Sequence, residues 1–165
     1  MTTTGLQLRS LVKEDKTLEL SLAEVEVPDP GPDEVLVRID ATPINPSDMG
    51  LLLGPADPTT FRAGGSTERP LLTADVPEAA MRMVAARVGK SMPVGNEAGG
   101  VVIAAGSSDA AQALMGKTVG MAGGEMYAQY RCMNAMMCLE LPGDTTAAEG
   151  ASCYVNPMKI GRAHV

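Results

Sequence analysis

The stretch from Val94 to Val102 reads Val-Gly-Asn-Glu-Ala-Gly-Gly-Val-Val and runs into the apolar residues of 101–105. A short apolar run of this kind, rich in β-branched residues, is typical of a buried strand. The three glycines come before that strand, whereas the glycines of a phosphate-binding loop follow a strand and open a helix. They therefore do not predict a phosphate cradle, and we expect them to allow close approach of neighbouring backbone.

Alternation on both sides of this stretch predicts further strands. Apolar and polar residues alternate over 6–12 and 18–22 with a polar turn between them, which predicts an N-terminal hairpin. The proline-rich run 28–32 predicts a turn or a stiff link before another alternating strand at 34–40. Many short strands joined by Gly- and Pro-containing turns favour a mainly β fold with a few helices. Four more strands are expected at 101–105, 117–121, 126–131 and 138–141.

Helical patterns occupy less of the chain. A short helix is expected over 45–54, and a longer amphipathic helix over 75–89. A capping motif predicts a third helix over 145–154. The segment 55–70 has no period and predicts a surface loop. Residues 55–89 as a whole admit two interpretations, a flexible cover over the substrate side of a cleft or a static packed insertion.

Composition restricts the class of partner. The 165-residue chain has a net charge of −7 and no cluster of Lys or Arg, which argues against nucleic acid and anionic membrane surfaces. No apolar run is long enough to predict a membrane span. Cys132, Cys138 and Cys153 have no short repeated spacing, so they predict neither a disulfide framework nor a metal clip, and we expect them in the core. A cytoplasmic location follows from this cysteine usage.

The C-terminal end has an unusual sequence. Ile160 to Val165 match the translation of a common sequencing adapter, so we expect residues 159–165 to be an adapter artefact and the native sequence to stop at Met158. A natural tail with the same residues is the alternative. His164 is the sole histidine of the chain, and a mechanism that used it as a base or a metal ligand would rest on this tail.

Four motifs follow one another along the chain: Pro30–Arg38, Ile44–Asp48, Val94–Val102 and Met126–Tyr130. Their order, within residues 6–158, resembles the medium-chain dehydrogenase/reductase superfamily, in particular its zinc-free quinone reductases and enoyl reductases. The resemblance implies a GroES-like, partly open β-barrel as the N-terminal catalytic domain over 1–144. It also implies the start of a linking helix over 145–158 and a Rossmann domain that is missing from this sequence.

The resemblance implies NADPH or NADH as cofactor, bound mainly by the missing domain, and no zinc. In the zinc-dependent alcohol dehydrogenases of the superfamily, a Cys and a His stand where this chain has Asn45 and Asn96. Neutral amides are poor zinc ligands compared with thiolate and imidazole. We therefore expect hydride transfer without a metal.

The resemblance also places four candidate cofactor contacts. Asn45 is the candidate catalytic residue, and its alternative role is an Asn-Pro turn that caps a helix. Asp48 either caps the same helix or holds Asn45, and Tyr127 either lines the cleft or packs across strands. Asn156 lies where the cofactor-side helix of the family begins. No tyrosine occurs in 49–61, where the enoyl reductases carry one.

Two functions remain open from the sequence. The first is the N-terminal fragment of an NAD(P)H-dependent, zinc-free oxidoreductase that transfers hydride to or from a quinone, enoyl or carbonyl-type small molecule, the fragment itself being inactive. The second is a non-catalytic GroES-like β-barrel that binds a partner. A homodimer of the full-length protein is left open.

Overall fold

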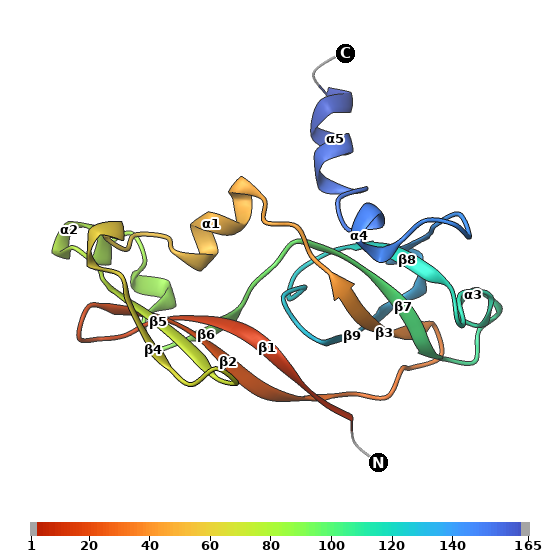
Figure 1. Ribbon diagram of the computed structural model, residues 1–165, viewed down its shortest axis with the longest axis horizontal. Coiled ribbons are helices and arrows are strands. Elements are labelled where there is room, and N and C mark those ends of the chain that lie inside the picture. Colours follow the sequence, from red (N-terminus) through yellow and green to blue (C-terminus); the bar gives the residue numbers. More distant parts are fainter. Residues whose placement is uncertain (1–2, 163–165) are drawn as a thin grey trace.

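Two antiparallel five-stranded sheets form the molecule in a computed structural model that describes residues 3–162 (Figure 1). The first sheet has the order β4-β5-β2-β1-β6, and the second has the order β10-β8-β7-β3-β9. The sheets do not close into one barrel, so the predicted mainly β, partly open fold is confirmed. The strands are β1 Thr3–Val12, β2 Thr17–Val27, β3 Glu34–Ala41, β4 Arg62–Gly65, β5 Pro70–Asp75, β6 Ser91–Pro93, β7 Glu97–Ala105, β8 Thr118–Ala122, β9 Tyr130–Asn134 and β10 Cys138–Glu140.

The predicted N-terminal hairpin is confirmed. β1 and β2 pair without interruption from Thr3 opposite Val27 to Val12 opposite Leu18. β2 is longer than the alternation over 18–22 predicts, because it continues through the residues that precede the proline-rich link. This long ribbon is the centre of the first sheet.

A short irregular segment, 127–129, joins the two sheets. The Leu8 N–H donates to the carbonyl oxygen of Tyr127 at 2.8 Å, and the Gln129 N–H donates to that of Leu6 at 2.9 Å. The Ile39 N–H on β3 donates to the Gln129 carbonyl at 2.9 Å. The strand predicted over 126–131 is therefore wrong in its first half, because these residues divide their hydrogen bonds between the two sheets and β9 starts only at Tyr130.

Among the described residues, the hydrophobic core forms three separate clusters. In the first sheet, Val12, Leu18 and Val76 are buried and pack against the helical segments that follow β5. A second cluster, formed by Val27, Leu36 and Cys132, includes the β3 side chain that points to the opposite face from Val35 and Val37. The largest cluster lies on the Val35 and Val37 face of the second sheet. It contains Val35, Val37, Ala98, Val102, Ala111, Leu114, Val119, Met121, Met126, Met133 and Ala135.

Residues 55–89 differ from their predicted loop and single helix. β4 and β5 form a hairpin, and β5 pairs with β2, so the segment belongs to the first sheet. The predicted helix over 75–89 is broken into short pieces. Asp75 still belongs to β5, and the apolar side chains of 80–88 pack against the buried cluster around Val12. The structure thus favours the packed insertion over the flexible cover. The short helices here are η1 Pro58–Thr60, α2 Glu78–Met81 and η2 Ala85–Arg87.

Of the remaining helices, α1 lies near the first sheet, α3 and α4 lie beside the second sheet, and α5 projects away from both sheets (Figure 1). Thr146 caps its helix with Glu149 as predicted, but that helix ends at Gly150 and a separate one begins at Val155. The backbone of the adapter-like tail continues the last helix to Arg162, and His164 lies outside the described residues. These helices are α1 Pro46–Leu52, α3 Asp109–Ala113, η3 Ala135–Met137, α4 Ala147–Gly150 and α5 Val155–Arg162.

The glycines of 94–102 allow the close packing that their position predicts. A Cβ atom on Gly99 would overlap the carbonyl oxygen of Ala147 in α4, and one on Gly100 would overlap the Arg38 carbonyl in β3. Gly95 has a φ of 99°, a left-handed conformation that favours glycine. Glycine is thus required where α4 and β3 press against β7.

We predict that Gly99→Ala destabilises the fold by about 2 kcal/mol or more, because the overlap is with backbone that cannot rotate away. Urea unfolding measures the change. Gly143→Ala is the matched control, since no atom lies within 4 Å of its Cβ position. Equal unfolding free energies for the two variants would show that α4 does not need this close approach.

Candidate functional site

The site begins at the N-terminus of α1. Asn45 is the N-cap residue, and Pro46 occupies the first helical position, where its missing N–H costs nothing. The Asp48 carboxylate turns back and accepts the Asn45 N–H at 2.8 Å. The capping alternative for Asn45 and Asp48 therefore holds, although both side chains also have partners elsewhere.

Asp48 is a buried acceptor for three donors. Its side chain is 2% exposed. Oδ1 accepts from Asn96 Nδ2 at 2.6 Å, and Oδ2 accepts from the Tyr127 hydroxyl at 3.0 Å as well as from the Asn45 N–H. Asp48 therefore holds its neighbours through both oxygens, and its predicted contact with a cofactor stays a prediction.

Glu97, at the start of β7, is the second buried carboxylate and is 1% exposed. Oε1 accepts from Asn45 Nδ2 at 2.8 Å. Oε2 accepts from the backbone N–H groups of Tyr154 and Val155 at 3.2 and 2.8 Å, where α5 begins. Glu97 thereby joins α1, β7 and α5 through one side chain.

Sequence reasoning missed Glu97 as a functional residue. The available signal was an acidic residue between glycines, next to an apolar strand, where a charge is buried only if it is paired with donors. The sequence could not show that Asn45, 52 positions earlier, supplies one of these donors.

Tyr127 lines a pocket and also belongs to the hydrogen-bonded cluster, while its cross-strand packing stays a prediction. Its ring lines an apolar pocket, and its hydroxyl lies 3.0 Å from both Asp48 Oδ2 and the Pro43 carbonyl oxygen. Burial, together with the nearby Asp48 carboxylate, raises the pKa of Tyr127 well above its ordinary value. The hydroxyl therefore stays protonated and keeps donating toward Asp48.

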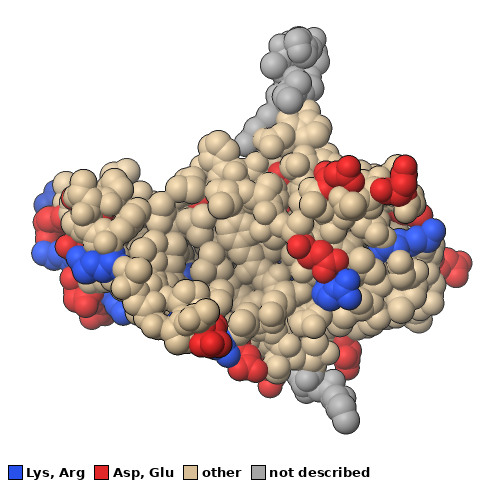
Figure 2. All heavy atoms as spheres, in the orientation of Figure 1, with Lys and Arg blue, Asp and Glu red and all other residues tan. Residues whose placement is uncertain are grey.

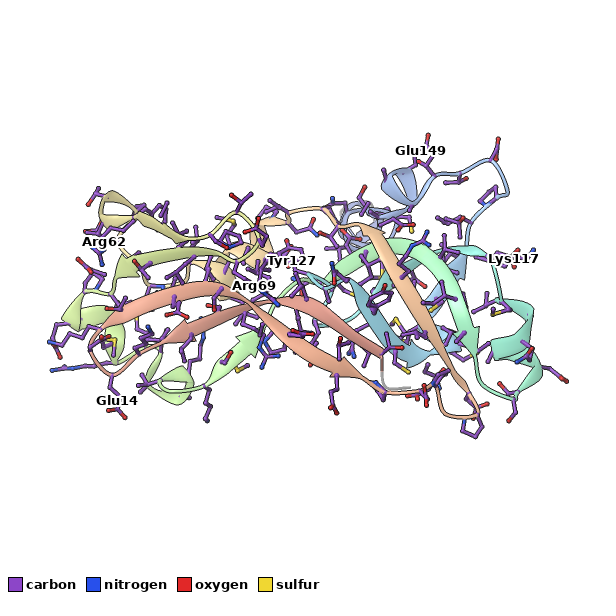
Figure 3. All side chains as sticks on the ribbon, turned by 60° about the horizontal axis from the view of Figure 1, so that its bottom comes forward. Glu14, Arg62, Arg69, Lys117, Tyr127 and Glu149 are labelled. Carbon is purple, nitrogen blue, oxygen red and sulfur yellow. The ribbon has the colours of Figure 1, made fainter. Side chains whose placement is uncertain are left out.

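An apolar pocket of about 480 Å³ opens beside this polar cluster. In Figure 3, Tyr127 lies in the middle of the molecule, where the two sheets meet. A cavity of this size and lining fits a small apolar or aromatic ligand. The pocket is lined by Leu8, Leu20, Thr42, Ile44, Leu52, Leu53 and Tyr127.

Asn156 is not part of the cluster. Its side chain is exposed on α5, one residue after the N–H that Glu97 accepts. Of the four predicted contacts, Asn45, Asp48 and Tyr127 are thus joined by hydrogen bonds, and Asn156 lies on the adjoining helix.

Asn45 and Asn96, the two asparagines that the resemblance aligns with zinc ligands, are both engaged as hydrogen-bond donors. Asn45 Nδ2 donates to Glu97, and Asn96 Nδ2 donates to Asp48. Among the residues that the structure describes, no group of three His, Cys, Asp or Glu side chains could hold a metal ion. The cysteines are free, with Cys132 buried and Cys138 and Cys153 partly buried.

Comparisons with solved structures identify the fold. The chain is similar to the quinone oxidoreductase of Coxiella burnetii, with a TM-score of 0.64 and 15% identity over 98% of this chain and 44% of that one. It is similar to Escherichia coli quinone oxidoreductase, solved with NADPH, with a TM-score of 0.61 and 16% identity over 98% of this chain and 40% of that one. The CurK enoyl reductase gives a TM-score of 0.63 and 14% identity over 94% and 40%.

These likenesses concern architecture. The sequence itself matches no protein-family model and no curated protein. At 14–16% identity, the likeness shows a shared fold, and the chain spans less than half the length of these reductases. The two sheets described above therefore have the fold of one part of the quinone and enoyl reductases.

We predict that Glu97→Gln loosens α5. The amide nitrogen of the new side chain would face another donor, either Asn45 or the N–H groups of 154–155, at a cost of about 1–3 kcal/mol. Amide hydrogen exchange at Val155 should then be faster than in the unmodified protein. Glu24→Gln, on the surface, should leave that rate unchanged, and an equally slow Val155 amide in E97Q would contradict the link.

We also predict a stability loss in alkali that depends on Tyr127. Its pKa is raised in the folded state above the unfolded value of about 10, so its contribution is complete below about pH 10 and is lost as the pH rises further. Urea unfolding at increasing pH should show a smaller loss for Tyr127→Phe than for the unmodified protein. Tyr130→Phe serves as the control, and identical pH profiles for all three proteins would be inconsistent with this assignment.

Proposed function

We propose that the chain is the substrate-side part of an NADPH-dependent, zinc-free oxidoreductase that reduces a quinone, enoyl or carbonyl-type small molecule. One observation carries the proposal: a buried polar cluster containing Asn45 and Tyr127 lies against an apolar pocket of about 480 Å³. Such a pocket binds the apolar body of a substrate, and the polar groups at its border orient it. The structural likeness to NADPH-bound quinone oxidoreductase supports the cofactor.

The residues that line the apolar pocket suit the ring end of NADPH and not its phosphates. The pocket is mostly apolar and fits a flat ring, but it contains no Lys or Arg that could bind phosphates. Figure 2 shows that the middle of the face between the two ends of the molecule carries few charged side chains. We therefore assign the phosphates of NADPH to a part of the full-length protein outside this sequence. When bound, NADPH supplies the hydride.

Within the chain, the polar cluster sets the direction of Asn45. Because Glu97 can only accept, it draws the amide nitrogen of Asn45 toward itself and turns the amide oxygen the other way. Asp48 holds the backbone of Asn45 and the hydroxyl of Tyr127. Both carboxylates are positioning residues, and Asn45 is the candidate for contact with the nicotinamide or the substrate.

The proposal also covers the location, the class of substrate and the oligomeric state of the full-length protein. Within residues 3–162, no helix is long and apolar enough to cross a membrane. We propose a cytoplasmic location and a small-molecule substrate, and we retain a homodimer of the full-length protein as part of the proposal.

A charge placed at the pocket border tests the substrate site. Ile44 lines the pocket but is 72% exposed, so Ile44→Arg should fold normally. In the full-length protein, recovered from the source DNA, NADPH oxidation with duroquinone should show a KM about tenfold higher in I44R, because an apolar ring loses favourable contact.

Met83→Arg is the matched control, since Met83 is 86% exposed and lies outside the pocket. Its KM should equal that of the unmodified enzyme. A full-length protein that oxidises no NADPH with quinone, enoyl or carbonyl acceptors would instead favour the non-catalytic binding module. An equal KM in all three proteins would remove the pocket from the substrate site.

A further inference from the structure

A second, polar pocket lies on the opposite face of β1 from the apolar one. Successive side chains of a strand point to opposite faces, so Leu8 borders the apolar pocket while Gln7 and Arg9 border the polar one. This second pocket has a volume of about 230 Å³. Its wall is completed by 25–28 of β2 and its link and by residues 130–132 of β9.

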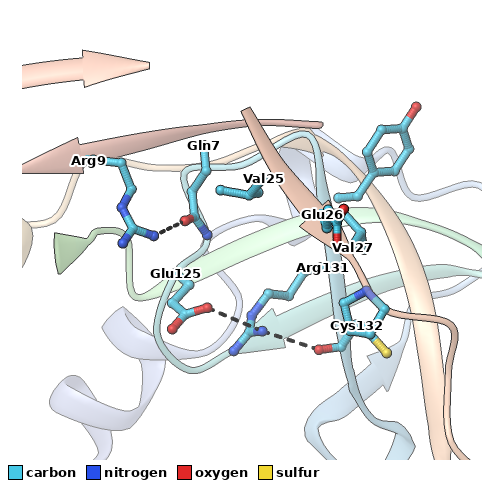
Figure 4. A pocket seen from close by; sticks show the side chains of 10 residues that line it. Gln7, Arg9, Val25, Glu26, Val27, Glu125, Arg131 and Cys132 are labelled. Carbon is cyan, nitrogen blue, oxygen red and sulfur yellow. Dashed lines mark hydrogen bonds and ion pairs between the residues drawn. The ribbon is translucent and has the colours of Figure 1, made fainter. Parts of the chain in front are cut away.

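Gln7 offers an unused donor to this pocket. Its side chain is 6% exposed, and Oε1 accepts from Arg9 Nη1 at 2.5 Å. Because arginine is only a donor, this bond fixes the orientation of the amide and turns the NH₂ group away from Arg9. Within residues 3–162, that nitrogen has no hydrogen-bond partner, and Figure 4 shows it on the pocket side of β1.

The nitrogen is also accessible from the pocket. The described side chains contain one fully buried polar atom without a partner, and that atom is Arg87 Nε. Gln7 Nε2 is therefore not sealed in the core. A buried amide whose NH₂ group reaches only a polar cavity is prepared to donate to a ligand there.

Arg9 adds a positive charge with neutral partners. Its guanidinium donates to Gln7 Oε1, to Ser91 Oγ at 3.2 Å and to the Ser91 carbonyl oxygen at 2.7 Å. In the described part of the chain it forms no ion pair with a carboxylate. Three of its five N–H groups are occupied by these bonds, so two remain for an acceptor.

The opposite wall carries charges of both signs. Arg131 forms an ion pair with Glu125 at 3.4 Å and donates to the Cys132 carbonyl oxygen at 3.3 Å (Figure 4). It also donates to the Gly124 carbonyl oxygen at 3.3 Å. Glu125, which lines the pocket, has a φ of 70°. This left-handed backbone conformation is uncommon for residues other than glycine. Burial raises the pKa of Cys132 to about 11, so its thiol is neutral at pH 7.

We propose that this pocket binds a small carboxylate, whose two oxygens accept hydrogen bonds from Gln7 Nε2 and from the free N–H groups of Arg9. The two oxygens of a carboxylate can accept from two different donors, and a donor that carries a positive charge forms the stronger of such bonds. Glu125 and Glu26 on the same pocket disfavour an ion with two or more negative charges, such as phosphate at neutral pH. The volume is below the range of about 300–1,000 Å³ typical of drug-sized ligands, which favours a small hydroxy acid or monocarboxylic acid.

Titration of the 165-residue chain with sodium lactate, followed by NMR of side-chain amide and arginine Nε signals, tests the site. Saturable shifts of the Gln7 and Arg9 signals are expected. Gln7→Glu preserves the shape and the bond to Arg9 but replaces the NH₂ group by an oxygen that repels a carboxylate. We expect binding at least about tenfold weaker in Q7E.

Two controls make the outcome decisive. Arg9→Lys should weaken lactate binding, because lysine lacks the planar fork of arginine. Arg62→Lys is the control and should leave lactate binding unchanged, since Arg62 is an exposed arginine on β4 that pairs with Asp75. Sodium chloride and sodium phosphate at equal ionic strength should not reproduce the shifts. Equal shifts with these salts, no saturation with lactate, or unchanged binding in Q7E would overturn the carboxylate site. None of these outcomes bears on the duroquinone test of the apolar pocket.

Discussion

The hydrogen bonds to the buried carboxylate of Glu97 are the interaction on which the arrangement of the site depends. A carboxylate that is 1% exposed must be compensated, and in the described part of the chain it is compensated by N–H donors rather than by a cation. One donor is the Asn45 side chain, and the others are backbone groups at the beginning of α5. The N-terminal end of a helix favours negative charge, so Glu97 suits this position. The direction of Asn45 and the place of α5 are therefore determined together.

The same logic explains why α1 lies where it does. Its N-terminal end is held through Asp48, which binds Asn96 and Tyr127 from two other segments. Its C-terminal end is held by Arg87, whose guanidinium donates to the Leu51 carbonyl oxygen at 2.8 Å and to that of Gly50 at 3.3 Å. A cation at this end complements the helix dipole and satisfies carbonyl groups that a short helix leaves free. Because both ends are fixed, the apolar residues of α1 form a stable wall of the pocket.

Local patterns predicted the parts of the fold whose partners are near in sequence. Alternation found the β1–β2 hairpin, and the Thr146–Glu149 capping box found the start of α4. Residues 55–70 resembled a loop because Gly, Pro and Thr hide the pairing of β4 with β5, which depends on the neighbouring β2. The site shows the same division: Asn45 and Asp48 were predicted from one motif, whereas the contact of Asn45 with Glu97 exists only after β7 is placed against α1.

The register of β1 is what separates the two pockets. The Leu6 N–H donates to Gln129 Oε1 at 2.9 Å, while the backbone of Gln129 donates back to the Leu6 carbonyl, so one residue of the joining segment fixes the strand. A shift of β1 by one residue would exchange its faces and place Gln7 against apolar side chains and Leu8 against charged ones. The first pocket would then lose its apolar lining from Leu8, and the second would lose the polar groups of Gln7 and Arg9. The link at 127–129 thus does more than connect the sheets, because it assigns the apolar face of β1 to the candidate substrate pocket and its polar face to the other side of the molecule.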